Sequence, residues 1–166
     1  MTLNEIFTIL AILAGPILAV QVEKYLSKLR DQKENREDLF KSLMLTRAKN
    51  LTEEHVDSLN MIALEFPIKK YRKVNDAWKE YLDHLNDKSY GEARIDEWER
   101  VRQDKFVDLL YVMSEALNFK YEKLLIKRQI YIPQGHILAN EEFEELKEKI
   151  LELLDGKRSL NIKTKQ

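Results

Sequence analysis

The chain contains no cysteine, which excludes disulfide bonds, thiolate nucleophiles and cysteine-based metal sites. It has only four glycines and three prolines among its 166 residues, and so few helix breakers favour long helices. A large excess of charge is also missing, since the formal net charge is −1. We therefore expect no nucleic acid as a partner. The sequence predicts an all-α protein with one domain and one additional element.

The additional element is an apolar stretch close to the N-terminus, from Ile6 to Val22, that carries no charged residue. Extended back to Leu3, it would form a helix of about 30 Å, which matches the hydrocarbon core of a bilayer. The apolar residues run around the whole helix, whereas an interfacial helix has a polar face. Gly15-Pro16 predicts a kink that a membrane tolerates. We expect residues 1–22 to be a transmembrane anchor, with residues 3–22 in lipid.

Two other interpretations of this stretch are weaker. A cleaved signal peptide needs a basic start and a small-residue cleavage site, and neither is present. A buried core helix would need a large shell of protein, but charged residues follow at once. Basic residues cluster only after the apolar stretch, and such residues stay in the cytoplasm: they are Lys24, Lys28, Arg30, Lys33, Arg36 and Lys41. We therefore expect a single-pass protein with its N-terminus outside and residues 23–166 in the cytoplasm.

Residues 23–50 predict a helical stalk that continues the anchor without a break. Apolar and basic residues alternate there at spacings of four and three, as in a coiled-coil seam: Val22, Leu26, Leu29, Lys33, Arg36, Phe40 and Leu43. One interpretation is a stalk that pairs two copies of the chain. The other is that only the end of the stalk packs, and that it packs on the protein's own domain; the residues concerned are Leu39, Phe40, Leu43 and Met44.

Residues 51–162 predict a bundle of about four helices, followed by a tail at 163–166. The expected helices cover 52–66, 70–86, 95–118 and 140–154, with Thr52 as the first N-cap and Gly156 as a stop signal. Apolar stripes predict their inner faces: Val56, Leu59, Ile62, Ala63 and Phe66; Val74, Ala77, Trp78, Tyr81, Leu82 and Leu85; Ile95, Trp98, Val101, Phe106, Leu109, Leu110, Met113, Ala116 and Leu117; Phe143, Leu146, Ile150, Leu153 and Leu154.

One segment, 124–140, breaks the helical pattern and is expected to be a loop. Its side chains offer cations, a phenol, an amide and an imidazole, which together suit a phosphate or carboxylate ligand: Lys127, Arg128, Tyr131, Gln134 and His136. The alternative is a structural turn that closes one end of the bundle. No motif for a catalytic residue, metal site or cofactor is present. His55 lacks a second zinc-protease histidine, and His84 is expected to point away from Asp83 and Asp87.

Four stretches together resemble a bacterial family known as a domain of unknown function. They are the apolar N-terminus, "HVDSLNMIALEF", "KKYRKVNDAWKEYLDHLND" and "IKRQIYIPQGH". The resemblance covers most of the chain and implies a small helical protein anchored in a bacterial inner membrane. It implies no activity and no catalytic residue.

Three functions are compatible with these observations. The first is a non-enzymatic, membrane-tethered module that binds a protein partner, and the absence of catalytic motifs favours it. The second is a small enzyme or nucleotide-responsive effector, as in bacterial defence, that uses the loop from Arg128 to His136. The third is a membrane-perturbing protein, but a single span without polar lining residues makes a poor pore.

Overall fold

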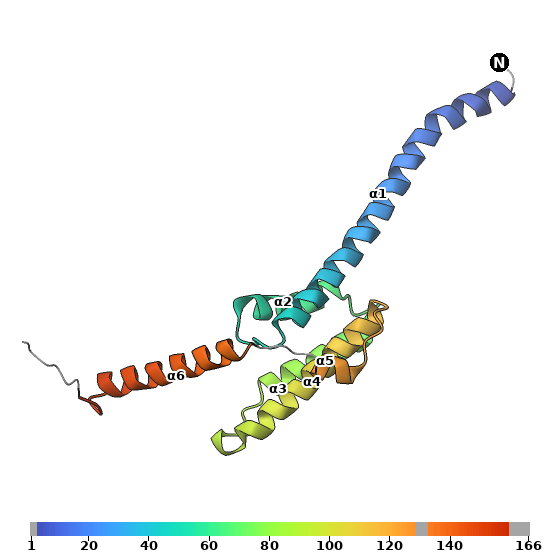
Figure 1. The fold of residues 1–166 in the computed structure, drawn as a ribbon. Coiled ribbons are helices and arrows are strands. Elements are labelled where there is room, and N and C mark those ends of the chain that lie inside the picture. Colours follow the sequence, from blue (N-terminus) through green and yellow to red (C-terminus); the bar gives the residue numbers. More distant parts are fainter. Residues whose placement is uncertain (1–2, 129–132, 160–166) are drawn as a thin grey trace, which may run out of the picture. The chain divides into compact units, whose positions relative to one another are not determined.

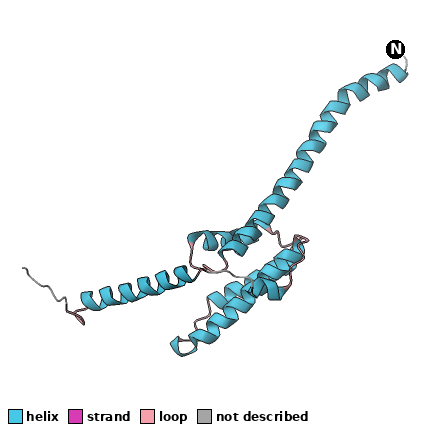
Figure 2. Ribbon diagram, in the orientation of Figure 1, coloured by secondary structure: helices cyan, strands magenta, loops and turns pink. Residues whose placement is uncertain are grey.

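The protein is built entirely from helices within the residues that the computed structural model describes, which are 3–128 and 133–159 (Figures 1 and 2). Side chains are described from residue 14 onwards, except at 92, 136, 137, 140 and 141 within these ranges. The chain divides into two compact units, residues 1–129 and 130–166. The all-α prediction is confirmed for the described residues.

The first unit begins with a single long helix, α1 (Leu3–Thr46), which includes Pro16. The predicted continuity between the apolar stretch and the stalk is therefore confirmed. Among the described residues, no helix is both long and apolar enough to cross a bilayer.

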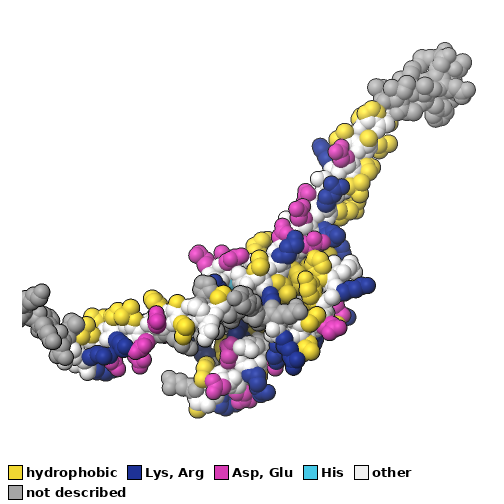
Figure 3. Space-filling model, viewed as in Figure 1, with side chains coloured by type: hydrophobic (Ala, Val, Ile, Leu, Met, Phe, Trp, Pro, Cys, Tyr) yellow, Lys and Arg dark blue, Asp and Glu magenta, His cyan; other side chains and the backbone are white. Residues whose placement is uncertain are grey.

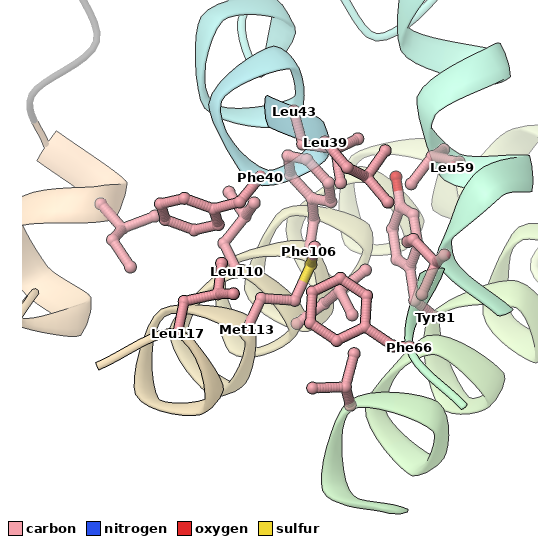
Figure 4. Packing of buried hydrophobic residues seen from close by; sticks show 14 residues of the cluster. Leu39, Phe40, Leu43, Leu59, Phe66, Tyr81, Phe106, Leu110, Met113 and Leu117 are labelled. Carbon is pink, nitrogen blue, oxygen red and sulfur yellow. The ribbon is translucent and has the colours of Figure 1, made fainter. Parts of the chain in front are cut away.

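The last turns of α1 pack with α2 (Glu53–Glu65), α3 (Arg72–Leu85) and α4 (Ile95–Ala116) around one apolar core. Contacts join α1 to α2 and α4, α3 to α4, and α2 to α3. Figure 4 shows side chains from all four helices meeting in this core. Its buried members are Leu39, Phe40, Leu43, Leu59, Ile62, Phe66, Val74, Tyr81, Phe106, Leu109, Leu110, Met113, Leu117 and Ile126.

The coiled-coil pattern along α1 therefore has two different environments. Leu29 is 44% exposed, whereas Leu43, at the equivalent position two heptads further along, is fully buried. Contacts with the bundle explain why the pattern contains the basic residue Arg36. Its guanidinium lies 5.2 Å from the Tyr71 ring centroid and donates to the Glu65 carbonyl at 3.4 Å. A cation at the last carbonyl of α2 also suits the negative end of that helix. The end of the expected stalk thus packs within its own bundle.

The buried faces of α2 and α3 differ from the predicted stripes. On α2, Val56 is 45% exposed and Ala63 is exposed, while His55 and Ser58 are buried. On α3, Leu82 is 39% exposed, and its neighbours Tyr81 and His84 are buried. In α4, the predicted inner residue Ile95 is 57% exposed. Each polar side chain that replaces an apolar one in the interior has a hydrogen-bond partner there, and this lowers the cost of burial.

Helix α4 ends with a left-handed residue, Asn118, at φ 61°. The Phe119 amide donates to the Ser114 carbonyl at 2.8 Å, and the Asn118 amide donates to the Glu115 carbonyl at 3.1 Å. This pattern is the Schellman motif, which satisfies the last carbonyls of a helix. Asparagine is one of the few residues besides glycine that adopts this conformation readily.

The segment 124–140, predicted as one loop, is instead largely helical where it is described. A short helix, α5 (Lys123–Arg128), packs on α4 and buries Ile126. Lys123 pairs with Asp108, and Lys127 pairs with Asp104, so two ion pairs one helical turn apart join α5 to α4. The prediction missed α5 because a six-residue helix gives too short a periodic signal.

The described part of the second unit consists of α6 (Gln134–Leu154) and a short extension. This helix begins six residues before the predicted start at 140, with Pro133 as its N-cap. Its C-terminal stop is as predicted: Gly156 has φ 72°, and its amide donates to the Leu153 carbonyl. The large apolar side chains of α6 that the structure describes are exposed or half-buried: Leu138, Phe143, Leu146, Ile150, Leu151 and Leu154 are exposed, and Leu153 is half-buried.

Candidate functional site

A groove of about 340 Å³ lies where α2, α3 and α4 meet, and we call it the α2–α4 groove. Its walls are mainly apolar and aromatic, and asparagine side chains interrupt them. The lining residues are Asn50, Leu51, Val56, Leu59, Asn60, Trp78, Tyr81, Leu82, Leu85, Asn86, Trp98 and Arg102. A concave, mostly apolar surface with a few polar groups is the usual form of a binding site.

A buried guanidinium lies in the lining of this groove. Arg102 is only 6% exposed, and its Nε and Nη2 atoms donate to the two Glu99 carboxylate oxygens at 2.6 Å each. Its Nη1 atom donates to the Tyr81 hydroxyl at 3.3 Å. With the Asn50 amide oxygen turned towards it, that oxygen accepts from both Nη atoms at 3.1 Å. Arg102 thus connects α4 with α3 and with the segment that precedes α2.

The charges around Arg102 are balanced within the protein. The hydrogen bond from Arg102 lowers the pKa of the Glu99 carboxyl, and the same bond raises the pKa of Arg102, so the pair stays ionised. Burial raises the pKa of the Tyr81 hydroxyl, which therefore remains neutral near pH 7. Because all the donor atoms of Arg102 already have acceptors, none is left over for an anionic ligand.

The walls of the groove are fixed by a reciprocal contact between α3 and α4. The Trp98 indole donates to the His84 carbonyl at 3.2 Å, and His84 Nε2 lies 2.9 Å from the Trp98 carbonyl. The two rings are stacked with centroids 5.3 Å apart. His84 must carry its proton on Nε2 to donate to that carbonyl. We infer that this pair holds the indole in place as a wall of the groove.

The rim of the groove combines exposed apolar side chains with amides. Leu51 is 91% exposed, Val56 is 45% exposed, and Asn60 and Asn86 are exposed beside them. An apolar side chain can enter such a groove while its backbone hydrogen-bonds to the amides. This chemistry suits a protein segment better than a small charged molecule.

A second polar cluster, centred on His55, lies between α1 and α2. His55 Nδ1 is 2.8 Å from Thr46 Oγ1, and the Thr46 hydroxyl donates to the Ser42 carbonyl at 2.8 Å. The Ser42 and Ser58 hydroxyls are 2.7 Å apart. His55 is fully buried, and burial lowers its pKa, with the Arg102 charge as a lesser cause. Because the imidazole is fully buried and these hydrogen bonds run between α1 and α2, the cluster joins the two helices.

The described residues of the predicted ligand site do not line the α2–α4 groove. Lys127 is on the exposed side of α5 and pairs with Asp104, and Arg128 is exposed at the end of that helix. Gln134 is the exposed first residue of α6, in the second unit. Tyr131 and the side chain of His136 lie outside the described residues. A site formed by these five residues therefore stays a prediction.

Sequence reasoning did not name Arg102 and considered His55 only as a metal ligand, although a signal for Arg102 is present. It lies four residues after Trp98 and four before Phe106, on the stripe that α4 buries. A lone arginine within an apolar stripe indicates a buried ion pair, and Glu99 three residues earlier is the natural partner. For His55 no such signal exists, because Thr46 is on a different helix.

The comparisons with other proteins give one positive result. No curated protein and no solved structure is significantly similar to the chain. A family model matches over residues 1–166, the full length of the sequence. The chain therefore belongs to the family of unknown function DUF6680.

Proposed function

We propose that the chain is a single-pass protein of the bacterial inner membrane that presents a binding module to the cytoplasm. Residues 3–22 would lie in lipid, and the α2–α4 groove would be the contact face for a protein partner. The observation that carries this proposal is the continuity of α1, which extends from the uncharged stretch into the core of the bundle. Any surface that held residues 3–22 would therefore also hold the bundle.

The uncharged stretch supports the membrane part of the proposal. The ten Ile, Leu, Val and Phe residues between Ile6 and Val22 favour the bilayer by roughly 3–6 kcal/mol on insertion scales, before Gly15, Pro16 and Gln21 subtract from this. The next part of α1 has a different character: the described side chains after residue 22 are charged on one side, and apolar ones lie along another (Figure 3). Lys24 and Lys28 follow the stretch directly, where basic residues favour the cytoplasmic side.

The groove supports a binding role over a catalytic one. Its arginine has no free donor, its tyrosine is neutral, and the Glu99 carboxylate is held by that arginine. General acid–base catalysis needs a group that exchanges protons with a substrate, and the described lining residues provide none poised near neutral pH. Apolar contacts flanked by amides remain, and these suit the recognition of a protein segment.

Fractionation tests the anchor. The full chain and a variant that starts at Glu23 are expressed separately, and lysates are centrifuged at high speed before and after an alkaline wash. We expect the full chain in the washed membrane pellet and the shortened variant in the supernatant. If both variants stay in the supernatant, the membrane part of the proposal is wrong.

The absence of cysteine allows a clean test of orientation. The variants Thr2→Cys and Lys88→Cys each carry a single thiol, which is treated in intact cells with a maleimide that does not cross the inner membrane. We expect labelling at position 2 in intact cells and at position 88 only after lysis. The reverse pattern would contradict the proposed orientation.

A cross-linking amino acid placed at Leu51 tests the groove, and Leu64 provides the matched control. Both are exposed leucines, at 91% and 69%, but only Leu51 lines the groove. Irradiation of living cells should give a discrete adduct from position 51 and none from position 64. Changing Asn60 to a bulky tryptophan should reduce that adduct. Equal adducts from both positions, or none from position 51, would reject the groove as the contact face.

A further inference from the structure

Helix α6 carries a continuous apolar seam with the spacing of a coiled coil. Ala139, Phe143, Leu146, Ile150 and Leu153 follow one another at alternating intervals of four and three residues. In heptad notation, Phe143 and Ile150 occupy position a, while Leu146 and Leu153 occupy position d. The described seam side chains are exposed or half-buried, so the helix has an apolar face that its own unit does not cover.

The charges on α6 argue against lipid as the cover for this seam. The face opposite the seam is acidic; its charged residues are Glu141, Glu144, Glu145, Glu148, Glu152 and Asp155. Interfacial helices bind anionic membranes through lysine and arginine on the polar face, and an acidic face is repelled. Figure 3 shows the apolar side chains of α6 on one side and charged side chains on another.

The residues that flank the seam distinguish two ways of pairing α6 with a copy of itself. In a parallel pair, position g of one heptad faces position e of the next heptad in the partner. This places Glu142, at g, opposite the partner's Lys147, at e, twice by symmetry. An antiparallel pair that matches Phe143 with the partner's Leu153 overlaps only over the C-terminal part of α6, and it places Lys147 near the partner's Lys147 and Lys149 near the partner's Lys149. An antiparallel pair over the whole helix brings Glu142 near the partner's Lys149, but it places Leu153 opposite position 136, a histidine, instead of an apolar residue. Of these arrangements, the parallel pair alone matches both the charges and the apolar seam.

We propose that α6 pairs with α6 of a second copy of this chain as a parallel two-stranded coiled coil. Among parallel coiled coils, a β-branched residue at a with leucine at d, as at Ile150 and Leu153, favours two strands over three or four. Leu154, at e, extends the contact, and the stem of the partner's Lys149 covers it. Leu138 and Leu151 stay at outer positions, and single exposed leucines are ordinary on a protein surface.

This inference does not depend on the membrane anchor or on the α2–α4 groove. It concerns the second unit, residues 130–166, whereas the proposed function rests on residues of the first unit. Loss of α6 pairing would leave the expected fractionation and the adduct from Leu51 unchanged. Failure of one proposal is therefore distinguishable from failure of the other.

Single cysteines in the full chain test the pairing, because the natural sequence has none. Ala139→Cys and Leu153→Cys place a thiol at d positions near either end of the seam, and Glu148→Cys places one on the opposite face as a control. Disulfides need Cα atoms within about 7 Å. After mild oxidation in cells, we expect cross-linked dimers at 139 and 153 and none at 148.

Co-expression of the 139 and 153 variants with different tags fixes the direction. The two positions are about 21 Å apart along the helix, at 1.5 Å per residue, so a parallel pair cannot join one to the other. A mixed 139–153 dimer would show antiparallel pairing and overturn the proposal. Equal cross-linking at 148, or none at 139 and 153, would overturn it as well, as would a heavier adduct with another protein at the seam positions.

Charge exchange provides a second test that leaves the seam intact. Glu142→Lys or Lys147→Glu alone replaces two attractive contacts per dimer with repulsive ones, and the cross-linking rate should fall about three- to tenfold. The double variant reverses both charges and should restore the natural rate. If the double variant remains as weak as the single ones, the assignment of facing positions is wrong.

Discussion

Replacing Leu43 with alanine tests whether the end of α1 belongs to the core of its own bundle. Leu43 is fully buried, and truncating a fully buried leucine costs about 2–5 kcal/mol through lost apolar contacts and the cavity left behind. We take about 3 kcal/mol as the expected loss in the free energy of unfolding. Leu26→Ala is the matched control: it alters the same seam, but Leu26 is 52% exposed, so its cost should stay within about 0.5 kcal/mol.

Urea unfolding of the full chain in a non-ionic detergent measures the difference. Trp78 and Trp98 are half-buried in the bundle, so their fluorescence reports its unfolding. With a slope of about 1.5 kcal/mol per M urea, the Leu43→Ala midpoint should fall by about 2 M. The shift should not change with protein concentration, because the contact is within one chain. Equal shifts for both variants, or a shift that vanishes on dilution, would refute intramolecular packing of Leu43.

Three further predictions concern the polar contacts and the end of α4. Because burial lowers the pKa of His55, the unfolded chain protonates this imidazole at a higher pH than the folded chain does. The free energy of unfolding should therefore fall as the pH drops below about 6.5, by at most about 1.4 kcal/mol per pH unit. Urea titrations at several pH values should show a smaller dependence of this free energy on pH for His55→Asn. Glu99→Gln should lower the free energy of unfolding by about 1–2 kcal/mol, less than for a fully buried ion pair because the Glu99 side chain is 41% exposed. Adding Arg102→Met should recover over half of that loss in the same urea titration. At Asn118, with φ 61°, thermal melts should show Asn118→Ala losing about 1 kcal/mol and Asn118→Gly losing nothing; equal loss by both would mean that the left-handed conformation is not the cause.

Local sequence patterns were sufficient for the helices themselves. The scarcity of glycine and proline, the capping position of Thr52 and the stop at Gly156 depend only on nearby residues, and each agrees with the structure. The continuity of α1 is likewise a local property, because nothing between residues 21 and 46 interrupts the helix. Pro16 also lies inside the helix without ending it.

Local patterns failed where a short helix or a polar contact depends on a distant partner. Segment 124–128 is helical because Ile126 and two lysines find partners on α4. The ligand site predicted around it rested on residue types, and the structure shows Lys127 already paired. In the α2–α4 groove, most lining residues had been assigned to the interior of the bundle, and their remaining exposure became visible only once the helices were placed.

The sequence by itself determined that this protein is helical, that one helix connects an uncharged stretch to a charged one, and that apolar seams run along α1 and α6. Tertiary structure alone decided which part of each seam is covered. Leu29 and Leu43 have the same periodic position, yet only Leu43 is buried, because α2 and α4 reach one and not the other. It also decided that Arg102 and His55 lie inside, since a buried polar group is stable only where distant residues supply its partners.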